Sequence, residues 1–315
     1  MPLSEFELIE RFFAAATAAR DDVLLGVGDD CALLQVPDGQ TLAASVDTLV
    51  EGRHFLVGAD PESLGHKALA VNLSDLASMG AIPAWATLAL TLPRADSTWL
   101  QAFMHGFSSL AAEHRMQLVG GDTTRGPLSI TIQVHGFVPR GQGLRRSGAR
   151  SDDRLFVSGT LGDAALALRQ RSGAGAVDEA LARRMDRPTP RIALGRLLLD
   201  YASAAIDVSD GLLGDLGHIC AASGVGAQIE LAKLPLTGPV AEAADWRLSL
   251  AGGDDYELLF AVPPSRVDGL CRAAAAAGHR IQEVGRLVDK PEITLVYPDG
   301  SMSKEMPDGF DHFRE

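Results

Sequence analysis

"VPRGQGLRRSGARSDD", residues 138–153, is a polar, glycine-containing segment that separates two apolar blocks of the chain. It contains four arginines and three glycines. Such a composition is typical of a connection between domains. We therefore expect a boundary near residue 145, with one domain over residues 1–145 and a second over residues 146–315.

On the N-terminal side of this segment, strand candidates alternate with helices. Ser4 and Glu7 form a capping-box pattern at the start of the first helix. The expected helices cover residues 4–19, 61–79 and 97–114. The expected strands are "TLAASVDTLV" (41–50), "AWATLALTL" (84–92), "QLVGGD" (117–122) and "LSITIQVHGFV" (128–138). This order predicts a mixed α/β sheet domain.

On the C-terminal side, the pattern again mixes strands and helices. Thr189 and Pro190 predict the N-cap and first position of one helix, and Gly211 and Gly224 bound another. The other expected elements are a strand, turn and helix over 154–170, strands over 204–209 and 256–262, a helix over 265–278 and a hairpin over 283–300. The fold class is therefore α+β, with two halves of similar size.

Composition argues against several classes of function. The chain has 315 residues, 46% of them hydrophobic and 22% charged, and a net charge of −13. This acidity argues against a nucleic-acid binder or a binder of anionic membranes. The longest apolar run is too short to cross a bilayer, and the N-terminus lacks a signal-peptide pattern. Cys31, Cys220 and Cys271 have neither disulfide nor metal spacing, which favours a cytoplasmic location.

An aspartate stands inside an apolar helix in "AVNLSDLASMGA", residues 70–81. On a helical wheel Asp75 falls beside Leu64, Ala68 and Val71. The other flank carries further leucines, so neither side resembles a solvent face. A buried carboxylate needs a cation, a metal or several hydrogen-bond donors. A structural ion pair and a metal ligand both satisfy this requirement.

Asp75 is one of several aspartates that stand next to glycine or serine and beside apolar runs. The group contains Asp29, Asp30, Asp47, Asp75, Asp122, Asp207, Asp210, Asp215, Asp254 and Asp255. Any one of these motifs alone is an ordinary turn or cap. Together they predict a site where oxygen ligands hold Mg²⁺ against phosphate groups, because Mg²⁺ prefers carboxylates and the chain lacks His or Cys pairs.

Familiar phosphate-binding and calcium-binding motifs are absent from the sequence. There is no P-loop or protein-kinase motif set, "GVGDDC" lacks the third glycine of a dinucleotide fingerprint, and "DVSDGLLGD" does not have EF-hand spacing. Arg145 and Arg146 lie in the linker. They read equally well as solvated linker charges and as contacts to a nucleotide phosphate.

Seven segments of the chain together resemble the thiamine-monophosphate kinase family, within the aminoimidazole ribonucleotide synthetase-like superfamily. They are "GVGDDCALL", "SVDTLVEGRHF", "KALAVNLSDLASMGA", "LVGGDTTRGPL", "AIDVSDGLLGDLGHI", "GGDDYELLF" and "DGFDHF". The resemblance implies a two-domain fold and a homodimer in which the N-terminal sheets of two subunits pair. It also implies ATP-dependent, Mg²⁺-dependent phosphorylation of thiamine phosphate to thiamine diphosphate.

The resemblance also implies site residues. The implied Mg²⁺ ligands are Asp30, Ser45, Val46, Asp47, Asp75, Asp122, Asp207 and Asp210, with several ions bound. The implied ATP contacts are Gly121, Asp122, Arg146 and Ser209, and the implied thiamine phosphate contacts are His54, Asp254 and Phe310. Val46 stands where many relatives have threonine, so only its carbonyl can serve. Asp254 stands where glutamate is common.

The expected reaction is direct in-line transfer of the γ-phosphoryl group to a phosphate oxygen. That nucleophile is largely ionised at neutral pH, so no side chain is needed as a general base, and Asp47, Asp75 and Asp122 are expected to be the most critical residues. The alternatives are another ATP-dependent activity of the superfamily, such as amidine ring closure, and a non-catalytic Mg²⁺–nucleotide-binding module. Selenophosphate synthesis and hydrogenase maturation are disfavoured, because the cysteines that they require in a glycine-rich N-terminal segment and at the C-terminus are absent.

Overall fold

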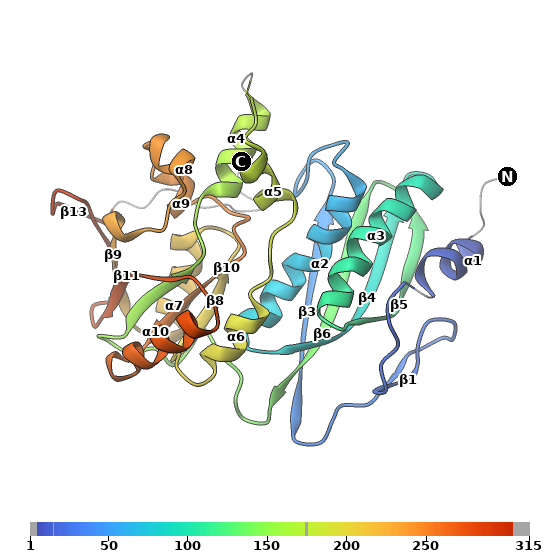
Figure 1. Cartoon of the computed structure of the whole chain (residues 1–315), viewed down its shortest axis with the longest axis horizontal. Coiled ribbons are helices and arrows are strands. Elements are labelled where there is room, and N and C mark those ends of the chain that lie inside the picture. Colours follow the sequence, from blue (N-terminus) through green and yellow to red (C-terminus); the bar gives the residue numbers. More distant parts are fainter. Residues whose placement is uncertain (1–4, 15, 174–175, 305–315) are drawn as a thin grey trace. The chain divides into compact units, whose positions relative to one another are not determined.

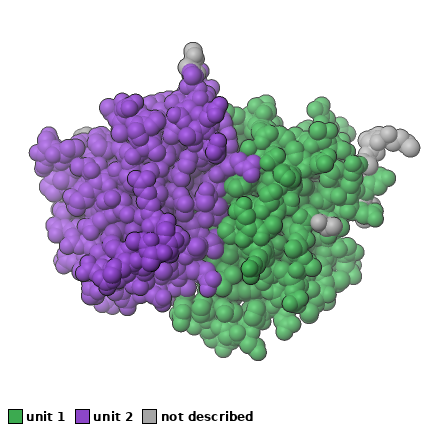
Figure 2. Space-filling view, viewed as in Figure 1, with its two compact units in different colours: residues 1–76, 81–142 green, residues 77–80, 143–315 purple. Residues whose placement is uncertain are grey.

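The computed structural model describes residues 5–14, 16–173 and 176–304 (Figure 1). The chain divides into two compact units. Unit 1 contains Met1–Leu76 and Ala81–Gln142, and unit 2 contains Ala77–Gly80 and Gly143–Glu315 (Figure 2). Residues 77–80, which the sequence pattern places in the first half, therefore belong to the second unit.

Unit 1 is built on a four-stranded sheet with the order β3-β6-β4-β5, accompanied by two long helices. Strands β4 and β5 are parallel, and the other neighbouring pairs are antiparallel. A small two-stranded sheet, β1-β2, precedes it. The elements are α1 (Glu5–Leu8), η1 (Ile9–Phe13), β1 (Val23–Leu25), β2 (Leu33–Leu34), β3 (Gln40–Val50), α2 (Pro61–Ser78), β4 (Ile82–Leu92), α3 (Ser97–Glu113), β5 (Gln117–Arg125) and β6 (Ser129–Pro139).

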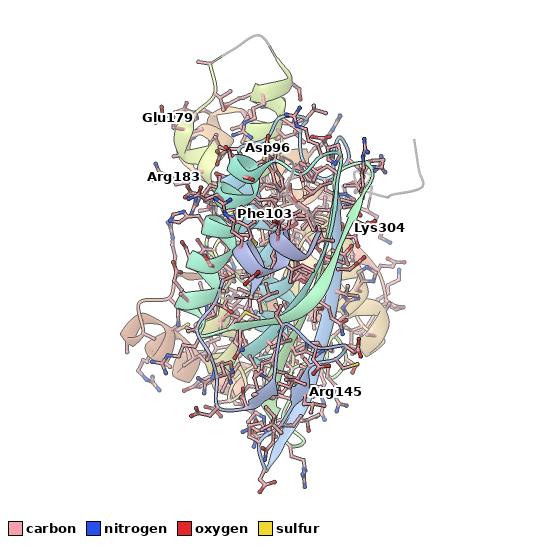
Figure 3. The ribbon with its side chains drawn as sticks, turned by 90° about the vertical axis from the view of Figure 1, so that its right-hand side faces the viewer. Asp96, Phe103, Arg145, Glu179, Arg183 and Lys304 are labelled. Atoms are coloured by element: carbon pink, nitrogen blue, oxygen red, sulfur yellow. The ribbon has the colours of Figure 1, made fainter. Side chains whose placement is uncertain are left out.

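Helices α2 and α3 approach each other closely at two glycines. A Cβ on Gly65 would lie 2.0 Å from the Phe103 carbonyl oxygen, and a Cβ on Gly106 would lie 1.8 Å from the Glu62 carbonyl oxygen. Asp96 caps α3 by accepting hydrogen bonds from the backbone N–H groups of its first turn (Figure 3). Hence the backbones of the two helices can touch only because both contact positions lack a side chain.

Both flanks of α2 are buried, as the helical wheel predicts. Ala68 and Val71 on one flank, and Leu69 and Leu73 on the other, are each at most 3% exposed. Such burial stabilises the helix through the hydrophobic effect, by about 1.5–3 kcal/mol for each large side chain. Asp75 therefore sits in a helix that has no solvent face.

Unit 2 contains a seven-stranded sheet with the order β13-β12-β9-β11-β7-β10-β8. Strand β10 pairs antiparallel with both β7 and β8, so the carboxyl ends of β7 and β8 lie at the same edge of the sheet as the start of β10. The elements are β7 (Arg154–Ser158), α4 (Asp163–Ser172), α5 (Glu179–Asp186), α6 (Ile192–Leu198), β8 (Ala204–Val208), α7 (Leu212–Ser223), β9 (Gly226–Glu230), η2 (Leu231–Lys233), α8 (Gly238–Glu242), α9 (Arg247–Leu250), β10 (Glu257–Val262), η3 (Pro264–Arg266), α10 (Val267–Ala276), β11 (Ile281–Val288), β12 (Ile293–Val296) and β13 (Met302–Ser303).

The main core of unit 2 joins one face of this sheet to α7. Ile206 on β8 and Leu259 on β10 pack in one cluster with Leu216 and Ile219 of α7. Every residue of β10 is buried. The central strand and α7 thus give the loops at this edge of the sheet a rigid support.

Three predictions about secondary structure are wrong. The hairpin over 283–300 does not form, because β9 lies between β11 and β12 and pairs with both. The helix predicted to begin at Pro190, with Thr189 as its N-cap, begins at Ile192 with Arg191 at the N-cap position, where the Arg191 side chain binds Glu257. The helix predicted over residues 4–19 becomes the short α1 followed by the π-helical η1, which ends at Phe13.

Candidate active site

The first group of predicted site residues lies where β3 faces α2. Ser45 donates a hydrogen bond through its hydroxyl to the Asp75 carboxylate. The backbone N–H of Asp47 donates to the Asn72 side-chain oxygen over 3.1 Å, and the Asn72 amide group donates to the Ala68 carbonyl over 3.0 Å. Ser45 and Asp47 point to the same face of β3 because they are two residues apart. The Asp75 carboxylate, the Ser45 hydroxyl and the Asn72 side-chain oxygen therefore lie along the same side of β3 as the Asp47 side chain.

Gly121 and Asp122 lie on β5, at the other edge of the same sheet. The strand register aligns Asp47 with Gly121 across β6 and β4, which corresponds to roughly 14 Å at the usual strand spacing. Asp122 belongs to the row of Thr48, so it points to the sheet face opposite that of Asp47. Within one unit the structure does not bring Asp122 to the group around Asp75.

The remaining predicted residues of unit 1 lie in loops or face away from α2. Asp30 is exposed in the turn between β1 and β2, and its N–H donates to Asp29 over 2.8 Å. The Val46 side chain is 58% exposed on the open face of the sheet, so its carbonyl is the only group that it offers as a ligand. His54 accepts a 3.0 Å hydrogen bond at Nδ1 from the Val50 N–H, which places the proton of the neutral ring on Nε2.

In unit 2, three predicted residues lie at the end of β8 and in the tight turn that follows it. Asp207 is 5% exposed on β8, and Ser209 and Asp210 follow. The Asp215 carboxylate on α7 accepts the N–H of Ser209 over 3.0 Å and that of Asp210 over 3.2 Å. Burial, followed by the nearby Asp210 charge, raises the pKa of Asp215 to about 7. Asp215 therefore fixes the shape of the turn.

The loop before β10 packs directly on this turn. The N–H of Asp254 donates to the Ser209 carbonyl over 2.9 Å, and a Cβ on Gly253 would lie 2.5 Å from the same oxygen. Asp254 and Tyr256 have φ values of 69° and 49°, which are unfavourable for residues with a side chain. The Tyr256 hydroxyl donates to the Asp254 carboxylate over 3.0 Å. This loop thus holds Asp254 in a strained, fixed conformation beside Ser209.

The linker arginines differ from each other in their surroundings. Arg146 is exposed, and its charge lowers the pKa of Asp215, so it lies within electrostatic reach of the turn after β8. Arg145 contributes its carbonyl, which accepts the Ala205 N–H over 2.9 Å. Phe310 lies outside the described residues.

The structure therefore brings predicted site residues together in two separate groups, one in each unit, and each group is rich in side-chain oxygens. Within residues 5–14, 16–173 and 176–304, no group of three or more His, Cys, Asp or Glu side chains is close enough to hold a metal by itself. Sequence reasoning did not assign roles to Asn72 and Asp215. Their positions, three residues before Asp75 and five after Asp210, are the signal that could have identified them. No helix of the described part combines the length and apolar character that a membrane crossing needs.

Two family models match the chain. The AIR synthase related protein N-terminal domain matches residues 28–138, and the corresponding C-terminal domain matches residues 150–298. The chain therefore has the two-domain fold that these models describe, and the two matches lie on either side of the arginine-rich linker.

Whole proteins match over almost the full length. The chain is 48% identical to the thiamine-monophosphate kinase of Salmonella typhimurium over 99% of both chains, and 34% identical to that of Bacillus subtilis over 99% of this chain and 100% of the relative.

Solved structures agree with these relatives. The thiamine-monophosphate kinase of Stenotrophomonas maltophilia superposes with a TM-score of 0.86 at 46% identity, covering 96% of this chain and 99% of the other. A protein described as AaThiL, solved with AMPPCP and TMP, superposes with a TM-score of 0.77 at 31% identity over 99% of both chains. This chain belongs to the thiamine-monophosphate kinases of the AIR synthase related family.

Proposed function

We propose that this chain uses ATP to phosphorylate thiamine monophosphate and so produces thiamine diphosphate. The observation that carries the proposal is the 48% identity to a thiamine-monophosphate kinase over 99% of both chains. The relative solved with AMPPCP and TMP supports ATP and thiamine monophosphate as the two substrates. A cytoplasmic location, expected from the sequence, is part of the same proposal.

In this reaction a phosphate oxygen of thiamine monophosphate attacks the γ-phosphorus of ATP in line with the leaving ADP. Because the second pKa of a phosphomonoester is about 6, the nucleophile is already ionised and needs no general base. The chain must instead align two anions and counter their repulsion. We assign contacts with ATP to Gly121, Asp122, Arg146 and Ser209, and contacts with thiamine monophosphate to His54, Asp254 and Phe310.

The ligand group between β3 and α2 fits Mg²⁺, which commonly binds one or two carboxylates together with substrate phosphates. Bound there, Mg²⁺ would neutralise the charge that builds up between the two reactants. Asp47 and Asp75 would hold it, and the Ser45 hydroxyl orients the Asp75 carboxylate. Asn72 fixes the backbone at Asp47. We extend the ligand set to Asp30, the Val46 carbonyl, Asp122, Asp207 and Asp210, for several ions in all.

A homodimer belongs to the proposal as well. Leu42, Val46 and Val50 on β3 are 42%, 58% and 38% exposed, and all three point to the open face of the sheet. Apolar side chains in such a row are typical of a surface that another chain covers. Pairing this face with the sheet of a second copy would bury them, and Asp122 lies on the same face.

The deciding experiment is product analysis after mixing the protein with ATP, Mg²⁺ and thiamine monophosphate. We expect thiamine diphosphate and ADP in equal amounts, and no label on the denatured protein when the γ-phosphate of ATP is labelled. Binding of Mg²⁺–ATP without any thiamine diphosphate would contradict the proposed activity. A labelled protein would contradict direct transfer.

A further inference from the structure

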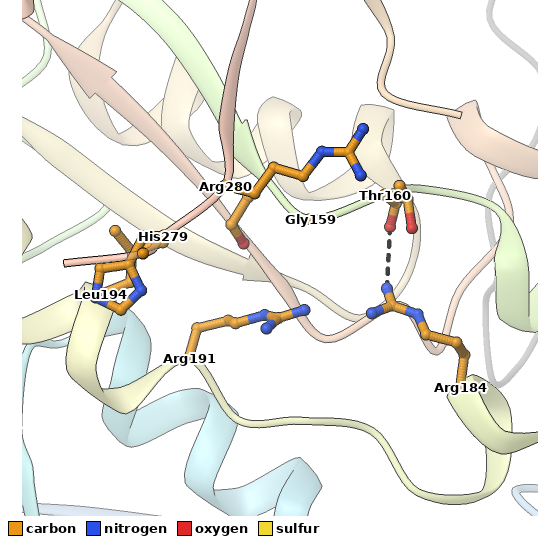
Figure 4. A pocket seen from close by; sticks show the side chains of 9 residues that line it. Gly159, Thr160, Arg184, Arg191, Leu194, His279 and Arg280 are labelled. Carbon is orange, nitrogen blue, oxygen red and sulfur yellow. Dashed lines mark hydrogen bonds between the residues drawn. The ribbon is translucent and has the colours of Figure 1, made fainter. Parts of the chain in front are cut away.

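Unit 2 contains a polar pocket of about 290 Å³ whose lining does not include Ser209 or Asp210 of the turn after β8. Its walls come from the end of β7, from α5 and α6, and from the loop before β11. Figure 4 shows the side chains of Arg184 and Arg191 pointing toward each other, with Arg280 running above them. Ser158, Thr160 and His279 complete its polar lining.

The buried carboxylate of Glu257, which is 0% exposed, holds two of the lining arginines in place. Arg191 binds this carboxylate with Nε and Nη2, and Arg184 binds it with Nη2 over 2.8 Å. The Ser158 hydroxyl donates the fourth hydrogen bond. Because a carboxylate accepts about four hydrogen bonds, Glu257 has no capacity left for further donors.

Gly159 makes room for this carboxylate. Its φ is 58°, and a Cβ at this position would lie 2.0 Å from Glu257 Oε1. The residue beside the arginine cluster is therefore restricted to glycine by both conformation and space.

Several guanidinium donors of the pocket have no protein acceptor among the described residues and can bind a ligand. Within the described part of the chain, Arg184 and Arg191 contact protein groups only through Nε and Nη2, so Nη1 of each donates to no protein group. Across the part of the chain that the structure describes, the Arg280 side chain has no ion-pair or hydrogen-bond partner; only its carbonyl is used, by the Gly159 N–H over 3.1 Å. N–H groups that can donate to a ligand thus come from three different segments.

The lining of the pocket carries positive charge. Among the described residues that line it are three arginines and no aspartate or glutamate. The nearby carboxylates lie behind this lining: Glu257 binds Arg184 over 2.8 Å, and Asp163 lies 3.4 Å from Arg184 Nε. Asp255 is buried and accepts the Gly162 N–H. The pocket therefore presents guanidinium groups to a ligand in a molecule whose net charge is −13.

We propose that this pocket is a second anion site, which binds a phosphate group, either as inorganic phosphate or as part of a phosphomonoester. Arginine suits this ligand because its planar guanidinium presents paired N–H donors to phosphate oxygens. Arg184 and Arg191 are held in place by Glu257, so they bind with little loss of side-chain freedom. Arg280 donates hydrogen bonds to the same anion from the opposite wall of the pocket.

The test is calorimetric titration of the full chain with inorganic phosphate in the presence of EDTA, so that Mg²⁺-dependent binding elsewhere does not contribute. We expect binding that Arg280→Ala weakens about 10-fold to 100-fold, the loss typical of charge-assisted hydrogen bonds, and that Arg280→Glu abolishes. The matched control is Arg272→Ala, which removes an exposed arginine of α10 outside the pocket and should leave the affinity unchanged.

Three outcomes would overturn the proposal: no binding of phosphate up to millimolar concentration, equal weakening by Arg280→Ala and Arg272→Ala, or equal binding of nitrate. A parallel titration with glycerol phosphate separates the two sources, because tighter binding than that of inorganic phosphate identifies a phosphomonoester site. The Arg280→Ala variant should still produce thiamine diphosphate, so the phosphate titration tests the pocket separately from the proposed kinase activity.

Discussion

Replacing Arg191 by methionine is expected to destabilise unit 2 by about 3 kcal/mol, because it removes one cation from a buried ion pair. Glu257 is fully buried and receives two of its four hydrogen bonds from Arg191, one of them from Nε over 2.7 Å. Methionine keeps the apolar part of the side chain and removes only the charge and the donors.

The magnitude follows from what remains around Glu257. Removing one partner of a buried pair commonly costs about 3–5 kcal/mol, because the other charge stays buried without compensation. Arg184 and Ser158 still donate to the carboxylate, and the Arg191 side chain is 26% exposed, so the lower end of this range applies. With a urea m-value of about 3 kcal/mol/M, the unfolding midpoint should fall by about 1 M.

The assay is urea unfolding followed by circular dichroism and by tryptophan fluorescence. Glu257→Gln in the Arg191→Met background should recover part of the loss, since the amide carries no charge that needs compensation. Arg183→Met, which changes an exposed arginine of α5, should shift stability by less than about 0.5 kcal/mol. A loss below about 1 kcal/mol in Arg191→Met, or no recovery in the double variant, would refute the reasoning.

Three further predictions address the site and the fold. Asp75→Asn and Asp122→Asn should each abolish formation of thiamine diphosphate while circular dichroism stays unchanged; normal turnover at ordinary Mg²⁺ would contradict the ligand assignment. Gly106→Ala should lower the free energy of unfolding by about 1–3 kcal/mol, because its Cβ would lie 1.8 Å from a backbone oxygen of α2. Gly217→Ala in α7, where no atom of the described residues lies within reach of the new Cβ, should raise the free energy of unfolding by about 0.5–1 kcal/mol. Equal effects of the two variants in urea unfolding would show that the contact between α2 and α3 does not limit stability. The pKa of Asp215 is raised to about 7 in the folded chain, so folding favours its protonated form. The free energy of unfolding should therefore fall by up to about 4 kcal/mol as pH rises from about 4 through 7. Asp215→Asn should remove this part of the pH dependence, and an unchanged dependence in that variant would contradict the prediction.

Much of the local structure could be predicted from sequence patterns. The burial of both flanks of α2 follows from helical periodicity. The sequence also indicates where α2 begins, because an aspartate followed by proline is typical of an N-cap, and Asp60 accepts a 2.8 Å hydrogen bond from the Ser63 N–H. Strand β9 was missed because "GAQIE" is too short to show alternation, and that omission produced the wrong hairpin. The sequence of one strand does not show which distant strand it pairs with.

The sequence by itself determined the two-part organisation, the positions of the acidic motifs and, through near full-length identity, the family. These properties are encoded within segments of ten to twenty residues or in the order of such segments. Only the tertiary structure decided which side chains meet. Ser45 reaches Asp75 across 30 residues of chain, and Glu257 gathers arginines from positions 66 and 73 residues away. Such contacts depend on strand register and helix packing, because a shift of one residue along β5 would move Asp122 to the other face of the sheet.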